Sequence, residues 1–138
     1  KRAMGRKIIT ALGGDARGKK VALLGLTFKP NTDDMRDAPS IAIVQTLLDA
    51  GAEVHAHDPE GMEEASKILP GVVMTDSAYA AAEGADAVAL VTEWDAYRAL
   101  DLVKLRAAMN GDAMIDLRNI YRSTEIEAAG FRYSSIGR

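Results

Sequence analysis

The chain has 138 residues, of which 48% are apolar and 27% are charged, and its formal net charge is −3. This length and composition are typical of a single globular domain with one hydrophobic core. The acidic balance argues against a nucleic-acid partner, which needs a basic face, and no apolar run approaches the roughly 20 residues that span a membrane.

Cysteine is absent, which excludes disulfides, thiolate metal sites and a cysteine nucleophile within this chain. This composition is compatible with a cytoplasmic protein, and residues 1–7 are too charged for a secretory signal. The chain does not begin with methionine. We therefore expect residues 1–138 to be one domain of a longer protein, with residues 1–13 as the tail of a helix from a preceding domain.

The apolar pattern predicts the elements of the first half of the chain. They are a helix over residues 3–12, a buried strand over 21–24, a helix over 41–50 and a strand over 53–57. Pro39 suits the first position of the second helix, and Gly51 suits the position after its end.

In the second half, strands and helices continue to alternate. The pattern predicts a helix over residues 62–69, strands over 72–74 and 87–91, an alanine-rich helix over 77–83, one or two helices over 95–109, a strand over 113–117, a short helix over 124–129 and a terminal strand over 131–135. The core positions expected between 95 and 109 are Tyr97, Leu100, Leu102, Val103 and Leu105.

This alternation predicts an α/β fold with three layers, α/β/α. Its centre is a doubly wound, mainly parallel sheet of five to six strands in the order 3-2-1-4-5. Ligands of such sheets bind at the carboxyl ends of the strands, where the strand order reverses. The fold is Rossmann-like, but the first strand is followed by only one glycine, Gly25, of the G-x-G-x-x-G pattern. Asp58 ends the second strand, where an acid can bind ribose, but it lies about thirty residues after Gly25 rather than twenty. We therefore expect no self-contained NAD site.

Residues 25–40 form a long polar connection between the first strand and its helix, and such loops on an α/β scaffold are usually functional. Two cations stand out in it. Lys29 has no carboxylate within three positions and is suited to an outside anion. Arg36 could bind a phosphate, or could equally pair with a neighbouring aspartate of the loop.

Other candidate residues are better explained by structure than by chemistry. His55 and His57 share a strand face but lack a third ligand, so no metal site is expected. Asp33 and Asp34 could suggest magnesium, but the neighbouring cations favour a role in holding the loop. Trp94 is expected to anchor a helix against the sheet, and no catalytic residue is expected in this chain.

Residues 25–40, GLTFKPNTDDMRDAPS, resemble the C-terminal-domain signature of the nucleotide-sugar 6-dehydrogenases, and are most similar to the bacterial enzymes that act on UDP-glucose. The similarity continues in order along almost the whole chain. It includes the segments at residues 51–54, 57–59, 91–94, 115–119, 130–133 and 135–138.

The resemblance implies the C-terminal, UDP-sugar-binding domain of an enzyme that oxidises UDP-glucose to UDP-glucuronate with two NAD⁺. In that family the NAD-binding domain and the catalytic cysteine precede this domain, so the chain alone is expected to be inactive. Its implied partners are the UDP-sugar and the enzyme's own N-terminal and central domains, in a full-length homodimer.

By the same resemblance, Lys29 matches the lysine that contacts the UDP-sugar, and Arg36 matches an arginine that reaches NAD across the interdomain cleft. Asp33, Asp34 and Asp37 are then expected to orient these cations. Arg118 and Asn119 match a motif of the family, but the resemblance assigns no ligand to them. The alternatives are the same domain of an enzyme for UDP-N-acetyl-mannosamine or GDP-mannose, a stand-alone nucleotide-binding module, or a pure assembly domain.

Overall fold

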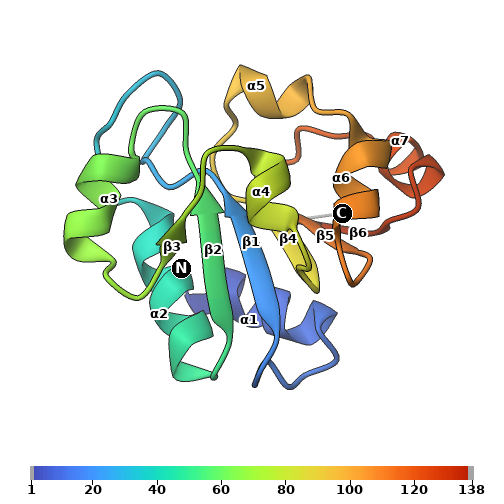
Figure 1. Ribbon diagram of the computed structural model, residues 1–138, viewed down its shortest axis with the longest axis horizontal. Coiled ribbons are helices and arrows are strands. Elements are labelled where there is room, and N and C mark those ends of the chain that lie inside the picture. Colours follow the sequence, from blue (N-terminus) through green and yellow to red (C-terminus); the bar gives the residue numbers. More distant parts are fainter. Residues whose placement is uncertain (1, 137–138) are drawn as a thin grey trace.

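The computed structural model describes residues 2–136, and in this part of the chain six strands form one sheet with seven helices around it (Figure 1). The strands are β1 (Lys20–Leu24), β2 (Glu53–His57), β3 (Val73–Met74), β4 (Ala87–Leu90), β5 (Ala113–Asp116) and β6 (Arg132–Ser135). The helices are α1 (Arg2–Ala11), α2 (Pro39–Asp49), α3 (Met62–Ile68), α4 (Ala78–Ala82), α5 (Asp95–Arg98), α6 (Leu102–Ala108) and α7 (Ser123–Ala128).

The strands are parallel and follow the order β3-β2-β1-β4-β5-β6. The predicted fold class and the order of the first five strands are confirmed, and the terminal strand adds a sixth position beside β5. The chain moves outward from β1 through β2 to β3, then returns to pair β4 with the other side of β1. This reversal places a switch point between β1 and β4, where ligands of such sheets bind.

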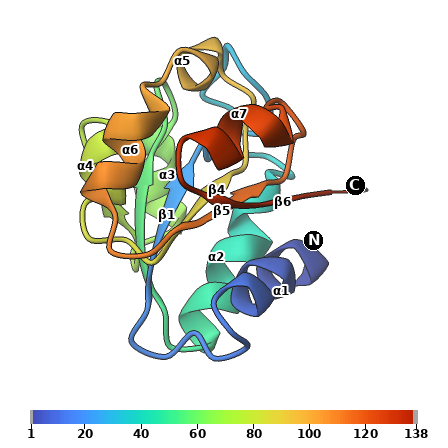
Figure 2. The ribbon, with the colours of Figure 1, turned by 90° about the vertical axis from the view of Figure 1, so that its right-hand side faces the viewer.

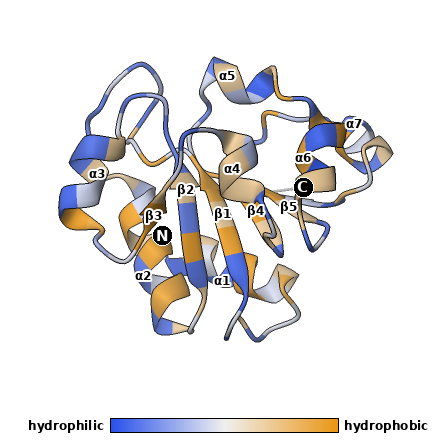
Figure 3. Cartoon of the chain, viewed as in Figure 1, coloured by the Kyte–Doolittle hydropathy of each residue, from blue (hydrophilic) through white to orange (hydrophobic). Residues whose placement is uncertain are grey.

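The helices cover both faces of the sheet, as Figure 2 shows with α1 and α2 on one side and α4 and α6 on the other. Strands β1, β4 and β5 are buried almost throughout, and their apolar residues point alternately into two core clusters. One cluster joins the sheet to α1, α2 and α3, and the other joins it to α4, α5, α6 and α7. In Figure 3 most of β1 accordingly has the hydrophobic colour, whereas β2 is largely hydrophilic.

Helix α1 is an integral part of the first layer. Ile8 is fully buried, and Gly5 allows α1 to approach α2 closely. A Cβ atom at Gly5 would lie 2.8 Å from the Cβ of Thr46. Arg132 of β6 also donates a hydrogen bond of 3.2 Å to the carbonyl of Ala11, so the end of α1 is fixed to the sheet.

One predicted core position is wrong. Val103 is 68% exposed, whereas Leu102 and Leu105 are buried. Helix α6 begins only at Leu102, so these two residues, three apart, face the sheet and Val103 between them faces solvent. Lys1, Gly137 and Arg138, the last two of which end the similar segment at residues 135–138, lie outside the described residues.

Candidate functional site

The carboxyl ends of β1, β2 and β4 lie side by side. Leu24, the last residue of β1, is in register with His57 of β2 and with Leu90 of β4. The segments that follow these strands therefore meet at one end of the sheet, which is the upper end in Figure 1. This end is the candidate site.

The connection after β1 is the longest of these segments. It runs from Gly25 to Ala38 without a helix or strand, and most of it is hydrophilic in Figure 3. Within it, the amide of Phe28 donates a 2.8 Å hydrogen bond to the carbonyl of Asp34, which closes residues 28–34 into a compact turn. Asn31 adopts a φ of 64° inside this turn, a backbone conformation that asparagine tolerates better than most residues.

Lys29 lies on this turn with its side chain exposed. In the part of the chain that the structure describes, its ammonium group makes no hydrogen bond or ion pair, although its charge contributes to lowering the pKa of Asp34. A lysine that retains its donors at the carboxyl end of a parallel sheet can accept a phosphate or carboxylate ligand.

Arg36 is paired within its own loop. Its guanidinium donates hydrogen bonds to both carboxylate oxygens of Asp34, and its Nη2 lies 2.9 Å from Oδ2. These hydrogen bonds, more than any other interaction, lower the pKa of Asp34 to about 2. The Arg36 side chain is nevertheless 89% exposed, and exposed ion pairs are weak. An anionic ligand could therefore compete with Asp34 for Arg36.

Of the three loop aspartates expected to orient the cations, Asp34 alone forms an ion pair or side-chain hydrogen bond with Arg36 among the described residues. Asp37 contributes only a longer-range electrostatic effect that helps raise the pKa of Arg36. Asp33 lines a surface hollow instead.

Asp58, the acid at the end of β2, is fully buried. Its carboxylate accepts hydrogen bonds from the amides of Leu26 and Thr27 in the next loop and from the amides of Glu60 and Gly61 in its own. Both oxygens are thus used inside the protein. Asp58 does not present a free carboxylate to a ribose hydroxyl in this structure.

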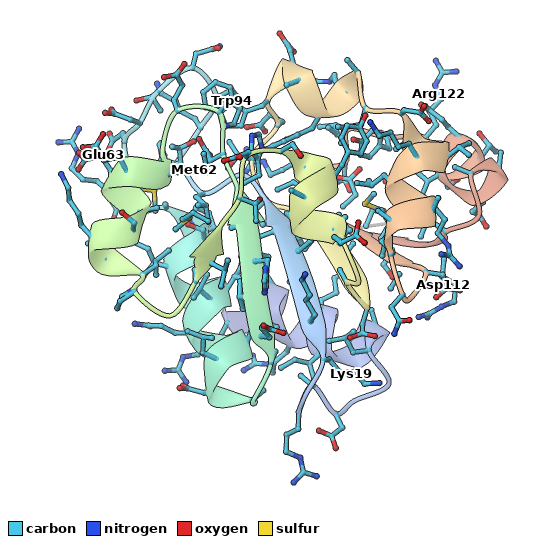
Figure 4. All side chains as sticks on the ribbon, in the orientation of Figure 1. Lys19, Met62, Glu63, Trp94, Asp112 and Arg122 are labelled. Atoms are coloured by element: carbon cyan, nitrogen blue, oxygen red, sulfur yellow. The ribbon has the colours of Figure 1, made fainter. Side chains whose placement is uncertain are left out.

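Trp94 packs in the core and also lies at the surface of the candidate site. It is 7% exposed and packs in the core cluster that includes Tyr97 of α5, as expected from the sequence. Its indole nitrogen also donates a 3.2 Å hydrogen bond to Asp58. Figure 4 shows Trp94 at the upper end of the molecule, at the opposite end from Lys19.

Two surface hollows adjoin the loop. One, of about 410 Å³, is lined by Asn31, Thr32, Asp33, Glu60 and Trp94. The other, of about 720 Å³, lies between residues 32–37 and α3, and Arg36 and Lys67 are among its lining residues. Lys29 lines neither hollow, so the lysine and the two hollows form an open surface rather than one enclosed pocket.

An ion pair between the segments after β4 and β5 was not foreseen from the sequence. Arg118 donates to Glu93 through Nε at 2.7 Å, and its Nη2 lies 2.6 Å from the same carboxylate oxygen. Asn119, which has a φ of 57°, donates to the carbonyl of Ile136. The segment that carries both residues is therefore fixed at the same end of the sheet as Lys29. The polar residues that follow each strand were the only signal of this pair.

The two histidines have structural partners. His57 Nδ1 lies 3.1 Å from the hydroxyl of Tyr97, which itself donates to the carbonyl of His57, and burial lowers the pKa of His57. His55 Nε2 lies 3.1 Å from a carboxylate oxygen of Glu53. Within residues 2–136, no cluster of three or more histidine, aspartate or glutamate side chains is arranged to hold a metal ion. None of the described helices has the length and apolar character needed to cross a membrane.

Residues 22–123 match the model of the UDP-glucose/GDP-mannose dehydrogenase family, UDP binding domain. This match covers the last three residues of β1, the polar loop with Lys29 and Arg36, and the segments after β2, β4 and β5. The chain belongs to this family. The family resemblance found in the sequence is thereby confirmed.

Individual relatives agree with the family match. The chain is 59% identical over its whole length to UDP-glucose 6-dehydrogenase of Rhizobium meliloti (strain 1021), of which it covers 32%. It is 44% identical over 131 residues to UDP-glucose 6-dehydrogenase of Pseudomonas aeruginosa, of which it covers 29%. The chain thus spans about a third of the length of the relatives it matches.

Solved structures of sugar-nucleotide dehydrogenases share the fold. An NDP-N-acetyl-D-galactosaminuronic acid dehydrogenase from Methanosarcina mazei Go1 superposes with a TM-score of 0.82 at 31% identity, over 99% of this chain and 28% of that one. A UDP-glucose dehydrogenase from Pyrobaculum islandicum superposes with a TM-score of 0.71 at 32% identity, over 83% of this chain and 25% of that one. The two structures carry different sugars in their names, so fold similarity alone does not identify a sugar.

Proposed function

We propose that this chain is the C-terminal, UDP-sugar-binding domain of a UDP-glucose 6-dehydrogenase. The observation that carries the proposal is the 59% identity to a UDP-glucose 6-dehydrogenase over the full chain. Residues 1–138 are then one domain, and residues 1–13 continue a helix of the preceding central domain. The whole enzyme would oxidise UDP-glucose to UDP-glucuronate with two NAD⁺ as a homodimer.

In this proposal Lys29 binds the diphosphate or sugar of the UDP-sugar. A lysine ammonium acts as a mobile point charge, which suits a phosphate that approaches an open surface. Arg36 would reach NAD held by another domain of the enzyme. Its weak, exposed pair with Asp34 keeps the guanidinium in place until that domain brings an anion close.

Ligand binding by the 138-residue chain tests the proposal, by calorimetry or ligand-observed NMR with UDP, UDP-glucose, GDP-mannose and NAD⁺. We expect weak binding of UDP and UDP-glucose that Lys29→Ala reduces about tenfold, as the loss of one charge-assisted contact implies. Lys19→Ala is the matched control, because Lys19 is an exposed lysine at the opposite end of the sheet (Figure 4).

Equal UDP affinity in Lys29→Ala and the parent chain would overturn the assignment of Lys29. Tighter binding of GDP-mannose than of UDP-glucose would favour the sister enzyme of the same family. The chain contains no cysteine, so we expect no NADH production from UDP-glucose and NAD⁺ by the chain alone. Measurable NADH would contradict the assignment of this chain as a binding domain only.

A further inference from the structure

The loop that carries Lys29 is held by side chains rather than by a helix or strand. The amides of Leu26 and Thr27 donate to Oδ2 of Asp58 at 2.7 and 3.1 Å. The carbonyl of Leu26 accepts a 2.6 Å hydrogen bond from the hydroxyl of Ser40 at the start of α2. The carbonyl of Thr27 accepts a 2.9 Å hydrogen bond from Thr92, which follows β4.

The same arrangement reaches Lys29 itself. The hydroxyl of Thr27 lies 3.0 Å from the carbonyl oxygen of Lys29 and 3.2 Å from Oδ2 of Asp58. Thr27 is 1% exposed and Asp58 is fully buried, so neither side chain can touch a ligand at the surface. A short path of two buried residues therefore connects the end of β2 with the backbone of the lysine.

The two oxygens of Asp58 have separate tasks. Oδ1 accepts the amides of Glu60 and Gly61, which shapes the turn after β2. Oδ2 accepts from the β1 loop and from the indole of Trp94, which belongs to the segment after β4. One carboxylate thus joins the three segments that meet at the switch point of the sheet.

We propose that Asp58 is a positioning residue for Lys29: it fixes the backbone of residues 26–29 so that the lysine is held in place before the UDP-sugar arrives. This inference rests on the proposed function, in which Lys29 contacts that ligand. Asp58 occupies the position where related folds bind a ribose, and here its charge organises the protein instead.

Physical chemistry favours this role over simple core stability. A buried carboxylate is tolerated only when hydrogen bonds replace its lost hydration, and here N–H donors from three segments do so. Such a network has one geometry that satisfies all of its members, so it selects one loop conformation. When a ligand-binding group is already held in place, less conformational entropy is lost on binding. Small displacements of such a group weaken binding strongly.

The test compares UDP binding by the 138-residue chain and by four variants, at a temperature where all are folded. Asp58→Asn replaces one oxygen by an NH₂ group, which must face amide donors on one side of the carboxamide whichever way it turns. Thr27→Val removes the hydroxyl that reaches Lys29 and keeps the side-chain shape. Lys29→Ala removes the proposed ligand contact.

Asp86→Asn is the matched control. Asp86 accepts a 2.8 Å hydrogen bond from the amide of Lys20, at the opposite end of β1 from the site. It is a carboxylate that holds the same strand but does not contact the loop. Its variant shows whether the loss of a carboxylate hydrogen bond elsewhere on β1 affects UDP affinity.

We expect Asp58→Asn to weaken UDP binding about tenfold and Thr27→Val about threefold, in line with the sensitivity of binding to small displacements. Asp86→Asn should bind UDP like the parent. The NMR amide signals of residues 26–29 should shift in the first two variants and remain in place in Asp86→Asn.

If Lys29→Ala loses UDP but Thr27→Val and Asp58→Asn bind within twofold of the parent, the positioning role is overturned and the proposed function stands. If Asp86→Asn weakens binding as much as Asp58→Asn does, Asp58 contributes only stability and the inference also fails. If the parent binds no UDP, or Lys29→Ala binds equally well, both proposals fall. Should Asp58→Asn not fold, Thr27→Val decides the question alone.

Discussion

Arg36 surrounds the carboxylate of Asp34, two residues earlier, with its backbone amide, Nε and Nη2, all within 3.3 Å of a carboxylate oxygen. Asp15 and Arg17 repeat the arrangement at the turn before β1, also with one residue between them. In both cases the intervening residue, Met35 or Ala16, is buried. The aspartate–x–arginine spacing therefore forms a local turn in which the buried residue points inward and the ion pair remains at the surface.

This relationship predicts a change in the pKa of Asp34. Because hydrogen bonds from Arg36 lower that pKa to about 2, Arg36→Ala should raise it towards the ordinary aspartate value. In the parent protein the ion pair is present at neutral pH and is lost only as the pH falls through the Asp34 pKa of about 2. An NMR titration of the Asp34 carboxyl carbon measures the shift.

Arg17→Ala is the control for that titration. It should raise the lowered pKa of Asp15 and leave that of Asp34 unchanged, because each arginine pairs with its own aspartate. An Asp34 pKa near 2 in the Arg36→Ala variant would mean that another cation, of which Lys29 is the nearest candidate, holds the carboxylate.

The partial burial of His57 predicts that the stability of the fold depends on pH. Burial lowers the pKa of His57 in the folded protein, so the unfolded chain binds a proton more readily. The stability that depends on neutral His57 is complete above the unfolded pKa and is lost as the pH falls through the folded one. The free energy of unfolding, from urea titrations, should decrease between pH 8 and pH 5.

His57→Gln should reduce this pH dependence. All other side chains are the same in the parent and the variant, so the difference between their two slopes of unfolding free energy against pH is due to His57. Identical slopes of unfolding free energy against pH in the two proteins would show that the hydrogen-bonded pair of His57 and Tyr97 remains intact when the imidazole is protonated.

The exposed face of α6 gives a direct test of the corrected core. Val103→Glu should change the free energy of unfolding by no more than about 0.5 kcal/mol, because Val103 is 68% exposed. Leu105→Ala should lower the free energy of unfolding by about 2 to 5 kcal/mol, because Leu105 lies on the sheet-facing side of α6 and is fully buried. Chemical denaturation of both variants measures the difference. A large loss in Val103→Glu would show that this face is covered by another surface in solution.

The sequence was sufficient for the architecture because the strands carry their own signal. The runs that became β1, β4 and β5 are apolar on both faces, as parallel strands between two helical layers must be. Val103 was misassigned for the opposite reason. In a segment such as α6, with only seven residues, two or three apolar positions are compatible with more than one inward face.

The site could be located from the sequence but not built from it. The length and polarity of the loop after β1 pointed to Lys29 and Arg36, and the spacing of Arg36 from its aspartates left its pairing open. The partners of the loop backbone come instead from Ser40, Asp58 and Thr92, which lie up to 65 residues from the atoms they contact. Such contacts depend on how β2 and β4 flank β1, which only the folded sheet determines.

Gly25 provides a last prediction, at the point where β1 ends. It has a φ of +99°, and a Cβ atom there would lie 2.5 Å from the Cβ of Thr92. Gly25→Ala must therefore strain the backbone and also displace Thr92, whose hydroxyl holds the carbonyl of Thr27. We expect a loss of at least about 2 kcal/mol in the free energy of unfolding.

Gly84→Ala separates the two causes. Gly84 also has a positive φ, of +69°, but a Cβ atom there would meet no other atom within 4 Å. Its loss should be limited to the backbone strain, about 1 to 2 kcal/mol. Urea denaturation of both variants gives the comparison. The new methyl group displaces Thr92 only in Gly25→Ala, so only that variant should also shift the NMR amide signals of residues 26–29. Equal losses and unchanged signals in both would mean that the loops after β1 and β4 are less tightly joined than the structure indicates.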